Sequence, residues 1–158
     1  MHTIPWYIVL VQSIPEAMLL MMIGFHLFRL DINIRTILII ATINSVLVYY
    51  FRYLEYFFIH TVLGLLTLII LTVILTKKNP WKIFISILTG ITIIAVLQSI
   101  TLPICFNMTE TTPEDLTTNP WLNFFFTIPQ MLIMIILYAY LRYSNYNFEY
   151  ITKEEYDG

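Results

Sequence analysis

The chain of 158 residues has little charge: 11% of its residues are Asp, Glu, Lys or Arg, while 59% are hydrophobic. Soluble domains carry about 25% charged and about 45–50% apolar residues. A soluble fold would lack the polar surface to cover so much apolar area, whereas lipid tails solvate apolar faces. The net charge of −2 also argues against nucleic-acid binding, which needs a basic patch. The scarcity of charge therefore favours an integral membrane protein.

Residues that carry catalytic or metal chemistry are also scarce. The single cysteine, Cys105, excludes a disulfide within the chain and a cysteine-rich metal site. The three histidines show no metal-ligand spacing, and the four glycines form neither a Walker A loop nor a dinucleotide-binding fingerprint. No serine lies in a nucleophile elbow. We therefore predict no catalytic residue, no metal and no cofactor, in a protein that is not an enzyme.

Long apolar stretches, in contrast, fill most of the chain. A bilayer core about 30 Å thick is crossed by roughly 20 apolar helical residues, so the sequence predicts an all-α, polytopic membrane helix bundle of about five spans. The stretch at 36–51 is shorter than the others, but it must cross to keep the flanking charges on consistent sides. The predicted spans are 5–27, 36–51, 56–75, 81–104 and 121–141. They form a transmembrane domain, residues 1–141, which a polar cytoplasmic tail, residues 142–158, follows.

Lysine and arginine predict the orientation, because they resist translocation across the membrane. With the N-terminus outside, the outer segments hold only Arg52. The inner segments then hold seven positive residues: Arg29, Arg35, Lys77, Lys78, Lys82, Arg142 and Lys153. Trp6 and Trp121 would lie at the outer interface and Trp81 at the inner one, as amphipathic rings prefer. We therefore predict a multi-pass protein with its N-terminus outside and its C-terminus inside.

The first and last predicted spans share a sequence pattern. Each has a proline near mid-membrane, Pro15 and Pro129, with a tryptophan eight or nine residues before it and an arginine thirteen or fourteen residues after it. Proline inside a helix frees a carbonyl and bends the axis, and a neighbouring helix or water must satisfy that carbonyl in lipid. Each proline is either a packing kink or a hinge beside a ligand niche.

Glu16 stands near the centre of the first span. A charged carboxylate there costs at least about 2.5–3.5 kcal/mol, so it must face protein or water or be protonated. Gln12 lies four residues away on the same helical face. At similar depths in other spans we expect Asn44, Gln98 and Gln130 to complete a polar layer. This layer would serve for interhelical hydrogen bonding, for ligand binding or sensing around Glu16, or for proton or ion movement.

Arg52 is the exception to the charge pattern. It either pairs with Glu55, three residues away, or reaches inward toward Glu16. His60, at the start of the third span, would join Arg52 and Glu16 if Arg52 reaches inward. Otherwise His60 is expected to be a cap at the membrane interface. His26, near the inner interface, is expected to be a boundary residue whose polar groups are satisfied rather than a proton relay.

Three short motifs link the chain to a known family: Ile14-Pro15-Glu16-Ala17, Arg52-Tyr53-Leu54 and Ile59-His60-Thr61. With them, the sequence resembles the multi-helix N-terminal membrane sensor region of GHKL-type bacterial sensor histidine kinases. It departs from the family pattern at Glu55, where a proline-containing turn is expected. It also contains no phospho-acceptor histidine segment and no nucleotide-binding boxes. We therefore expect a stand-alone relative of the sensor region, or the membrane part of a truncated kinase.

The resemblance implies a signal-input module of a two-component system in the bacterial cytoplasmic membrane. Its partners would be membrane lipid, a cytoplasmic signalling protein or kinase, a hydrophobic or peptide ligand, and a second copy of the chain in a homodimer. The alternative is a small transporter component or an immunity-type membrane protein. The A-x-x-x-A contacts expected of a vitamin-uptake component are absent from the sequence.

Overall fold

The computed structural model describes residues 6–51, 57–112, 115 and 119–145, which form five α-helices and no strand. The helices are α1 (Trp6–Leu27), α2 (Ile34–Phe51), α3 (Phe57–Thr76), α4 (Pro80–Thr109) and α6 (Pro120–Ser144). Four of them, α1, α2, α4 and α6, are long and apolar enough to cross a membrane, while α3 has a shorter apolar stretch at Thr61–Thr76. The all-α prediction is confirmed for these residues, and the apolar helices are those of a multi-pass membrane protein.

Two helices continue past the ends of the predicted spans. The fourth predicted span ends at 104, whereas α4 continues past Pro103 to Thr109. Pro103 removes one backbone donor without ending the helix, and the Thr109 hydroxyl donates to the Cys105 carbonyl at 2.7 Å in the last turn. The polar tail expected from Arg142 begins inside α6, which runs to Ser144. Beyond Asn145, that tail lies outside the described residues.

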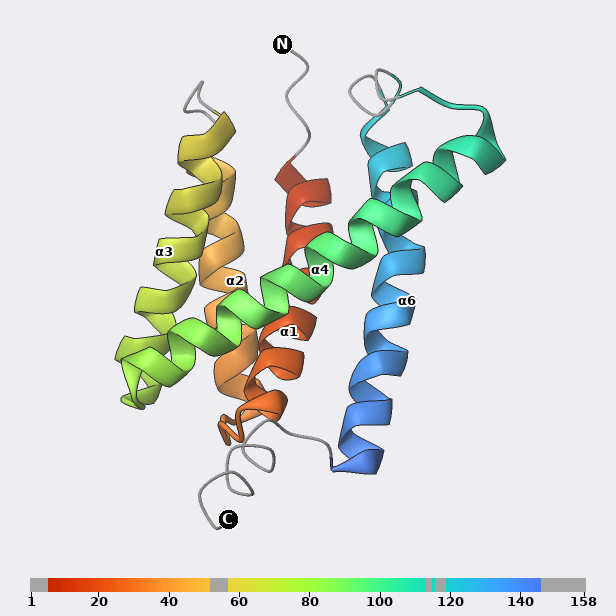
Figure 1. The fold of residues 1–158 in the computed structure, drawn as a ribbon. Helices are drawn as coiled ribbons and strands as arrows, with labels where there is room; N and C mark the ends of the chain where they lie inside the picture. The colour runs from red at the N-terminus through yellow and green to blue at the C-terminus, as the bar shows by residue number, and fades with distance from the viewer. Residues whose placement is uncertain (1–5, 52–56, 113–114, 116–118, 146–158) are drawn as a thin grey trace.

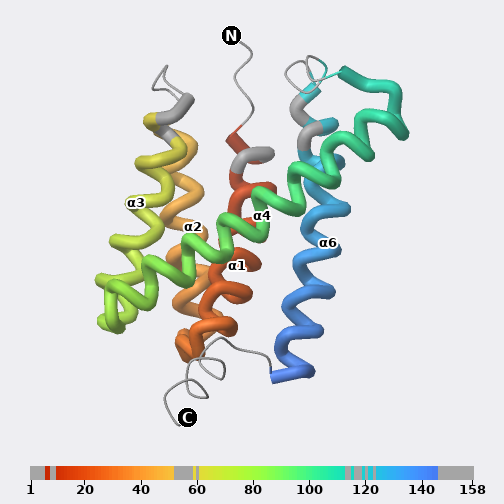
Figure 2. The backbone as a smooth tube through the Cα atoms, viewed as in Figure 1, coloured from red at the N-terminus to blue at the C-terminus, as the bar shows by residue number. Residues whose placement is uncertain are grey.

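Helix α1 is the central element, since it contacts α2, α4 and α6, while α3 packs against α2 and α4. Figure 1 and Figure 2 show α4 crossing obliquely in front of the other helices, from the lower end of α3 to the upper part of α6. At 1.5 Å per residue, the 30 residues of α4 span about 45 Å. Since the bilayer core is only about 30 Å thick, a strong tilt lets this long helix remain largely in the apolar layer.

The crossing of α1 and α4 is a backbone contact. A Cβ atom on Gly24 would lie 2.2 Å from the Ser86 carbonyl oxygen, and one on Gly90 would lie 2.7 Å from the Leu20 carbonyl oxygen. Ser86 and Gly90 are four residues apart on α4, which is the small-xxx-small pattern of close-packed membrane helices. These small residues therefore allow the oblique α4 to approach the central helix.

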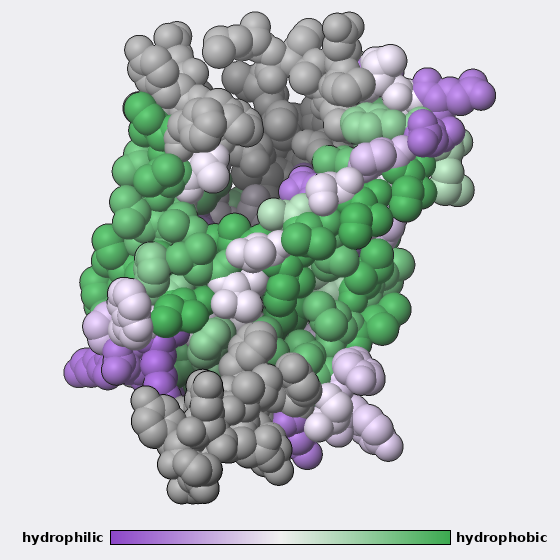
Figure 3. Space-filling model, viewed as in Figure 1, coloured by the Kyte–Doolittle hydropathy of each residue, from purple (hydrophilic) through white to green (hydrophobic). Residues whose placement is uncertain are grey.

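The buried core lies around this crossing. Its completely buried members include Met21, Ile23, Ile40, Ile83, Ile87 and Met134. Many other large apolar side chains are exposed, and Figure 3 shows hydrophobic residues over most of the visible face between the two ends of the molecule. An exposed apolar surface of this kind suits contact with lipid tails.

Candidate functional site

The predicted polar residues lie on four helices and differ in burial. Asn44 on α2 and Gln130 on α6 are buried, with 7% and 2% of their surface exposed. Gln12 and Glu16 on α1 and Gln98 on α4 are half-buried. None of these five residues is exposed, which is what a polar layer inside the bundle requires. Whether they bind a ligand stays a prediction.

Asn44 takes part in a contact between two helices. The Thr67 hydroxyl on α3 donates to the Asn44 side-chain oxygen at 2.8 Å, and it also lies 2.9 Å from the Leu63 carbonyl of its own helix. The neighbouring Ser45 hydroxyl is buried and has no hydrogen-bond partner among the described residues. Asn44 therefore links α2 to α3, which is the interhelical role considered for it from the sequence.

The predicted outer cluster falls mostly outside the described part of the chain. Arg52 and Glu55 lie in the segment 52–56, for which no structure is described. His60 belongs to α3, but its side chain is also outside the described residues. The proposed approach of Arg52 and His60 to Glu16 therefore stays a prediction.

Proline occurs inside three helices that contact one another. Pro15 and Pro129 are half-buried within α1 and α6, and Pro103 is exposed within α4. These three helices make pairwise contacts, while α2 and α3 contain no internal proline. The two helices with similar sequences, α1 and α6, thus pack side by side, and the third proline-containing helix, α4, packs against both.

The C-terminal ends of α1 and α6 are joined by His26. Its Nε2 lies 3.0 Å from the Leu141 carbonyl oxygen, and its ring meets Tyr138 edge to face with centroids 6.1 Å apart. The Leu141 carbonyl also accepts from the Asn145 backbone N–H, where Asn145 caps α6 in a left-handed conformation. The interpretation of His26 as a satisfied boundary residue agrees with this bond, although its link to α6 was not apparent from the sequence.

A cavity of about 920 Å³ lies beside this junction. Arg29, Asp31, Arg142 and Asn145 contribute polar groups to its lining, together with His26. The sequence did not point to this cavity, because its walls come from residues 22–37 and 138–145. The only available signal was the arginine that follows the proline in each similar helix, Arg29 and Arg142, which the structure brings to one cavity.

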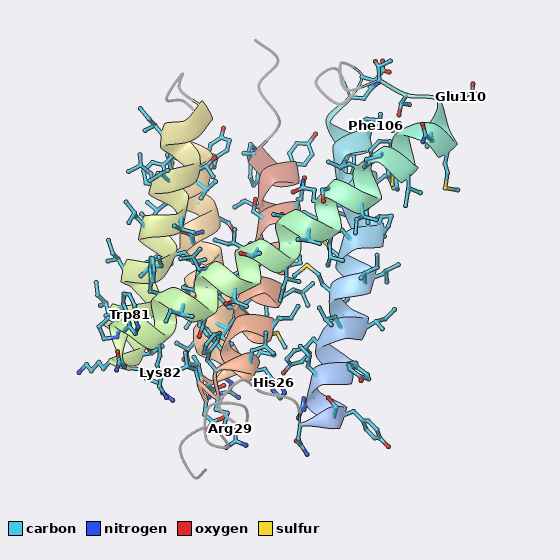
Figure 4. All side chains as sticks on the ribbon, viewed as in Figure 1. His26, Arg29, Trp81, Lys82, Phe106 and Glu110 are labelled. Atoms are coloured by element: carbon cyan, nitrogen blue, oxygen red, sulfur yellow. The ribbon has the colours of Figure 1, made fainter. Side chains whose placement is uncertain are left out.

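Aromatic residues line the opposite end. Tyr7 contacts Trp6 and Trp121, with ring centroids 5.9 and 6.2 Å apart, and thereby connects α1 to α6. Trp6 also lines a small groove of about 210 Å³ with Tyr49 and Tyr50 of α2. Trp81 lies at the other end of the molecule, near Lys82, in Figure 4. The tryptophans thus lie at two opposite ends of the molecule, and their location at the membrane interfaces stays a prediction.

Acidic groups are few among the described residues. No set of three His, Cys, Asp or Glu residues there could hold a metal ion. In the loop after α4, the Thr112 backbone N–H and hydroxyl donate to the Asp115 carboxylate at 2.7 and 2.9 Å. These bonds, the backbone one first, lower the pKa of Asp115 below its usual 3.8, because they stabilise the ionised form.

Comparisons with known proteins add no assignment: no family model, curated protein or solved structure matches this chain. The resemblance to the membrane region of sensor histidine kinases therefore rests on the short motifs alone.

Proposed function

We propose that the chain is a membrane sensor or regulatory protein that passes a change in the bundle to a cytoplasmic partner. The observation that carries this proposal is the junction of His26 with Leu141, where the proline-containing α1 is tied to the last turn of the proline-containing α6. The residues that follow α6 form the segment that a signalling protein or kinase would contact. The proposed orientation, with the N-terminus outside, puts this segment in the cytoplasm.

The input would act on α1 at Gln12, Pro15 and Glu16. These residues are half-buried and lie one to three turns from the aromatic outer end of the helix. A hydrophobic or peptide-like ligand that changes the protonation or contacts of Glu16 would alter the bend at Pro15, because the missing backbone bond makes the helix easier to bend there. The junction at His26 would carry this displacement to Leu141 and Arg142.

Distance measurements between spin labels test the transmission step. In a Cys105→Ser background, labels at Arg35 and Tyr143 mark the inner ends of α2 and α6, and both positions are exposed. We expect Glu16→Gln to shift the distance distribution between them in reconstituted full-length protein. His26→Phe added to Glu16→Gln should abolish the shift. An unchanged distribution in Glu16→Gln would contradict the proposal.

A transport assay separates the alternative class. The full chain is reconstituted in proteoliposomes and offered a panel of radiolabelled amino acids and vitamins. Accumulation above that of protein-free vesicles, lost in Glu16→Ala, would assign the polar layer to transport and overturn the sensor proposal. Under that proposal we expect no accumulation, together with normal membrane insertion of Glu16→Ala.

A further inference from the structure

The cavity at the inner ends of α1 and α6 has two chemically different walls. One wall carries apolar residues from α1, the α1–α2 loop and the start of α2. Ile34 is exposed and Met22 and Ile32 are half-buried, whereas Phe25, Leu30 and Ile37 lie behind them in the buried core. The other side carries the guanidinium groups of Arg29 and Arg142. The cavity thus combines an apolar surface with two cations, and its volume of about 920 Å³ lies in the range of ligand-binding sites.

The backbone holds both arginines in place. Arg29 has a left-handed conformation with φ 50°, and the next amide, of Leu30, donates to the Phe25 carbonyl at 2.8 Å to close the end of α1. Arg142 belongs to the last turn of α6, directly after Leu141, which His26 binds. The two cations come from different helices, but the junction fixes those helices to each other. Their side chains are exposed and therefore accessible to a ligand.

The charge around the cavity is predominantly positive. Among the residues that the structure describes, Asp31 is the one acidic residue in the lining, against two arginines. The Lys78 ammonium group donates to the backbone carbonyl of Asp31, which brings a third cation to this rim. In Figure 4, Lys82 and Trp81 lie at the same end of the molecule as Arg29 and His26. A tryptophan and several lysines at one end of a membrane helix bundle mark the level of the lipid headgroups.

We propose that this cavity binds an anionic phospholipid, with its phosphate between Arg29 and Arg142 and its acyl chains along the apolar wall. Arginine binds phosphate oxygens through two parallel N–H donors, and basic pockets between membrane helices bind anionic headgroups. A soluble phosphate would use the guanidinium groups but leave the apolar wall uncovered, whereas a phospholipid covers both. The proposal does not depend on the sensor function, because it concerns only the ligand of the inner cavity.

Native mass spectrometry of the full chain tests this ligand. Detergent-solubilised protein is mixed with phosphatidylglycerol or phosphatidylcholine, and the fraction that keeps a bound lipid is compared. We expect a preference for phosphatidylglycerol that falls about five-fold for each arginine removed, because one cation near the membrane surface raises the affinity for an anionic lipid by about five-fold. The variants are Arg29→Asn, because asparagine tolerates the left-handed backbone, and Arg142→Gln. Equal retention of the two lipids by the unmodified protein would overturn the proposal.

Matched variants separate the cavity from the general charge of this surface. Arg35→Gln removes an exposed cation that does not line the cavity, and it should leave the preference unchanged. Asp31→Asn removes the opposing charge, and it should raise the preference about five-fold. The double variant Arg29→Lys with Arg142→Lys keeps both positive charges and should keep most of the preference for phosphatidylglycerol. It therefore separates the loss of charge from a folding defect. A loss in Arg35→Gln as large as in the arginine variants of the cavity would overturn the proposal.

Two competitors define the other contradicting outcomes. Glycerol 3-phosphate should not displace phosphatidylglycerol at equal concentration, and displacement would assign the site to a soluble phosphate. The acidic residues of the tail could occupy the cavity instead. If phosphatidylglycerol is retained only after Glu154→Gln, Glu155→Gln and Asp157→Asn are combined in the full chain, the occupant is the tail and the lipid proposal is wrong.

Discussion

The imidazole Nε2 of His26 lies 3.0 Å from the carbonyl oxygen of Leu141, although 115 positions separate the two residues in the sequence. This bond joins the last turn of α1 to the last turn of α6, and the edge-to-face contact of His26 with Tyr138 reinforces it. The two helices with similar sequences are therefore attached to each other at the end that bears most of the positive charge.

Replacing His26 tests the strength of this junction. We expect His26→Phe to keep the ring contact with Tyr138 and lose the hydrogen bond. Polar contacts between membrane helices contribute on average about 0.6 kcal/mol and at most about 1.7 kcal/mol. The free energy of unfolding should therefore decrease by an amount in that range. Unfolding in mixed micelles, followed by circular dichroism, measures the change. Tyr138→Phe, which keeps the ring contact, is the control, and an equal loss in both variants would contradict the assignment.

The helices were predictable because hydropathy and length decide them in a membrane. Even the short stretch at 36–51 forms a helix, Ile34–Phe51, whose whole length is apolar enough to cross. Their ends were less predictable: the fourth predicted span ends at 104, but α4 continues for six residues after Pro103. A proline removes one hydrogen bond, and whether the helix then ends depends on contacts that the sequence does not show.

Contacts between distant residues were the least predictable part. Asn44 and Gln130 were expected at depth because polar residues are rare in apolar helices, and both are buried. The cavity beside His26 and the contact of Gly24 with Ser86 depend on how α1, α4 and α6 cross, which hydropathy does not determine. An unremarkable glycine and a serine thus become important only once the crossing is known.

The close crossing of α1 and α4 predicts opposite behaviour for two glycines. In Gly24→Ala the new methyl group would lie 2.2 Å from the Ser86 carbonyl oxygen, which belongs to rigid backbone. We expect a loss of about 1–3 kcal/mol in the free energy of unfolding, as for an overpacked core. In Gly64→Ala the nearest atom is the Val48 Cγ2 at 2.9 Å, which belongs to a side chain.

Gly64→Ala is therefore the matched control. A small shift of Val48 accommodates the methyl group, and alanine favours the helix by about 1 kcal/mol over glycine, so stability should change little or rise. Thermal unfolding of both variants in the same detergent gives the comparison. A similar loss for both glycines would show that the α1–α4 crossing is no tighter than that of α2 and α3.

The pair Asn44 and Thr67 predicts a weak coupling between α2 and α3. Without the Asn44 acceptor, the Thr67 hydroxyl can still donate to the Leu63 carbonyl at 2.9 Å. A double-mutant cycle of Asn44→Leu and Thr67→Val should therefore give a coupling energy near the membrane average of about 0.6 kcal/mol. Unfolding of the four proteins in mixed micelles measures it. A coupling above about 2 kcal/mol would place Asn44 in a larger polar network than this pair.

The loop after α4 predicts a dependence on acid. Because the hydrogen bonds from Thr112 lower the pKa of Asp115 in the folded chain, they stabilise the loop above the unfolded value near 3.8. This stabilisation is lost as the pH falls through the lower, folded pKa. A titration followed by the chemical shift of the Thr112 amide measures it. Thr112→Val keeps the backbone donor alone, so the pKa of Asp115 should rise only part of the way to 3.8.

The proposed orientation, with the N-terminus outside, predicts which end of the bundle reacts with a reagent that does not cross membranes. Met108, 80% exposed, lies between Phe106 and Glu110, which Figure 4 shows at the end opposite Arg29 and Lys82. Tyr143, 91% exposed, lies in the last turn of α6. In a Cys105→Ser background, we expect an impermeant maleimide to label Met108→Cys on intact cells. Tyr143→Cys should react only after permeabilisation, because the lysines and arginines near it resist translocation. The reverse labelling pattern would invert the bundle and with it the proposed cytoplasmic partner.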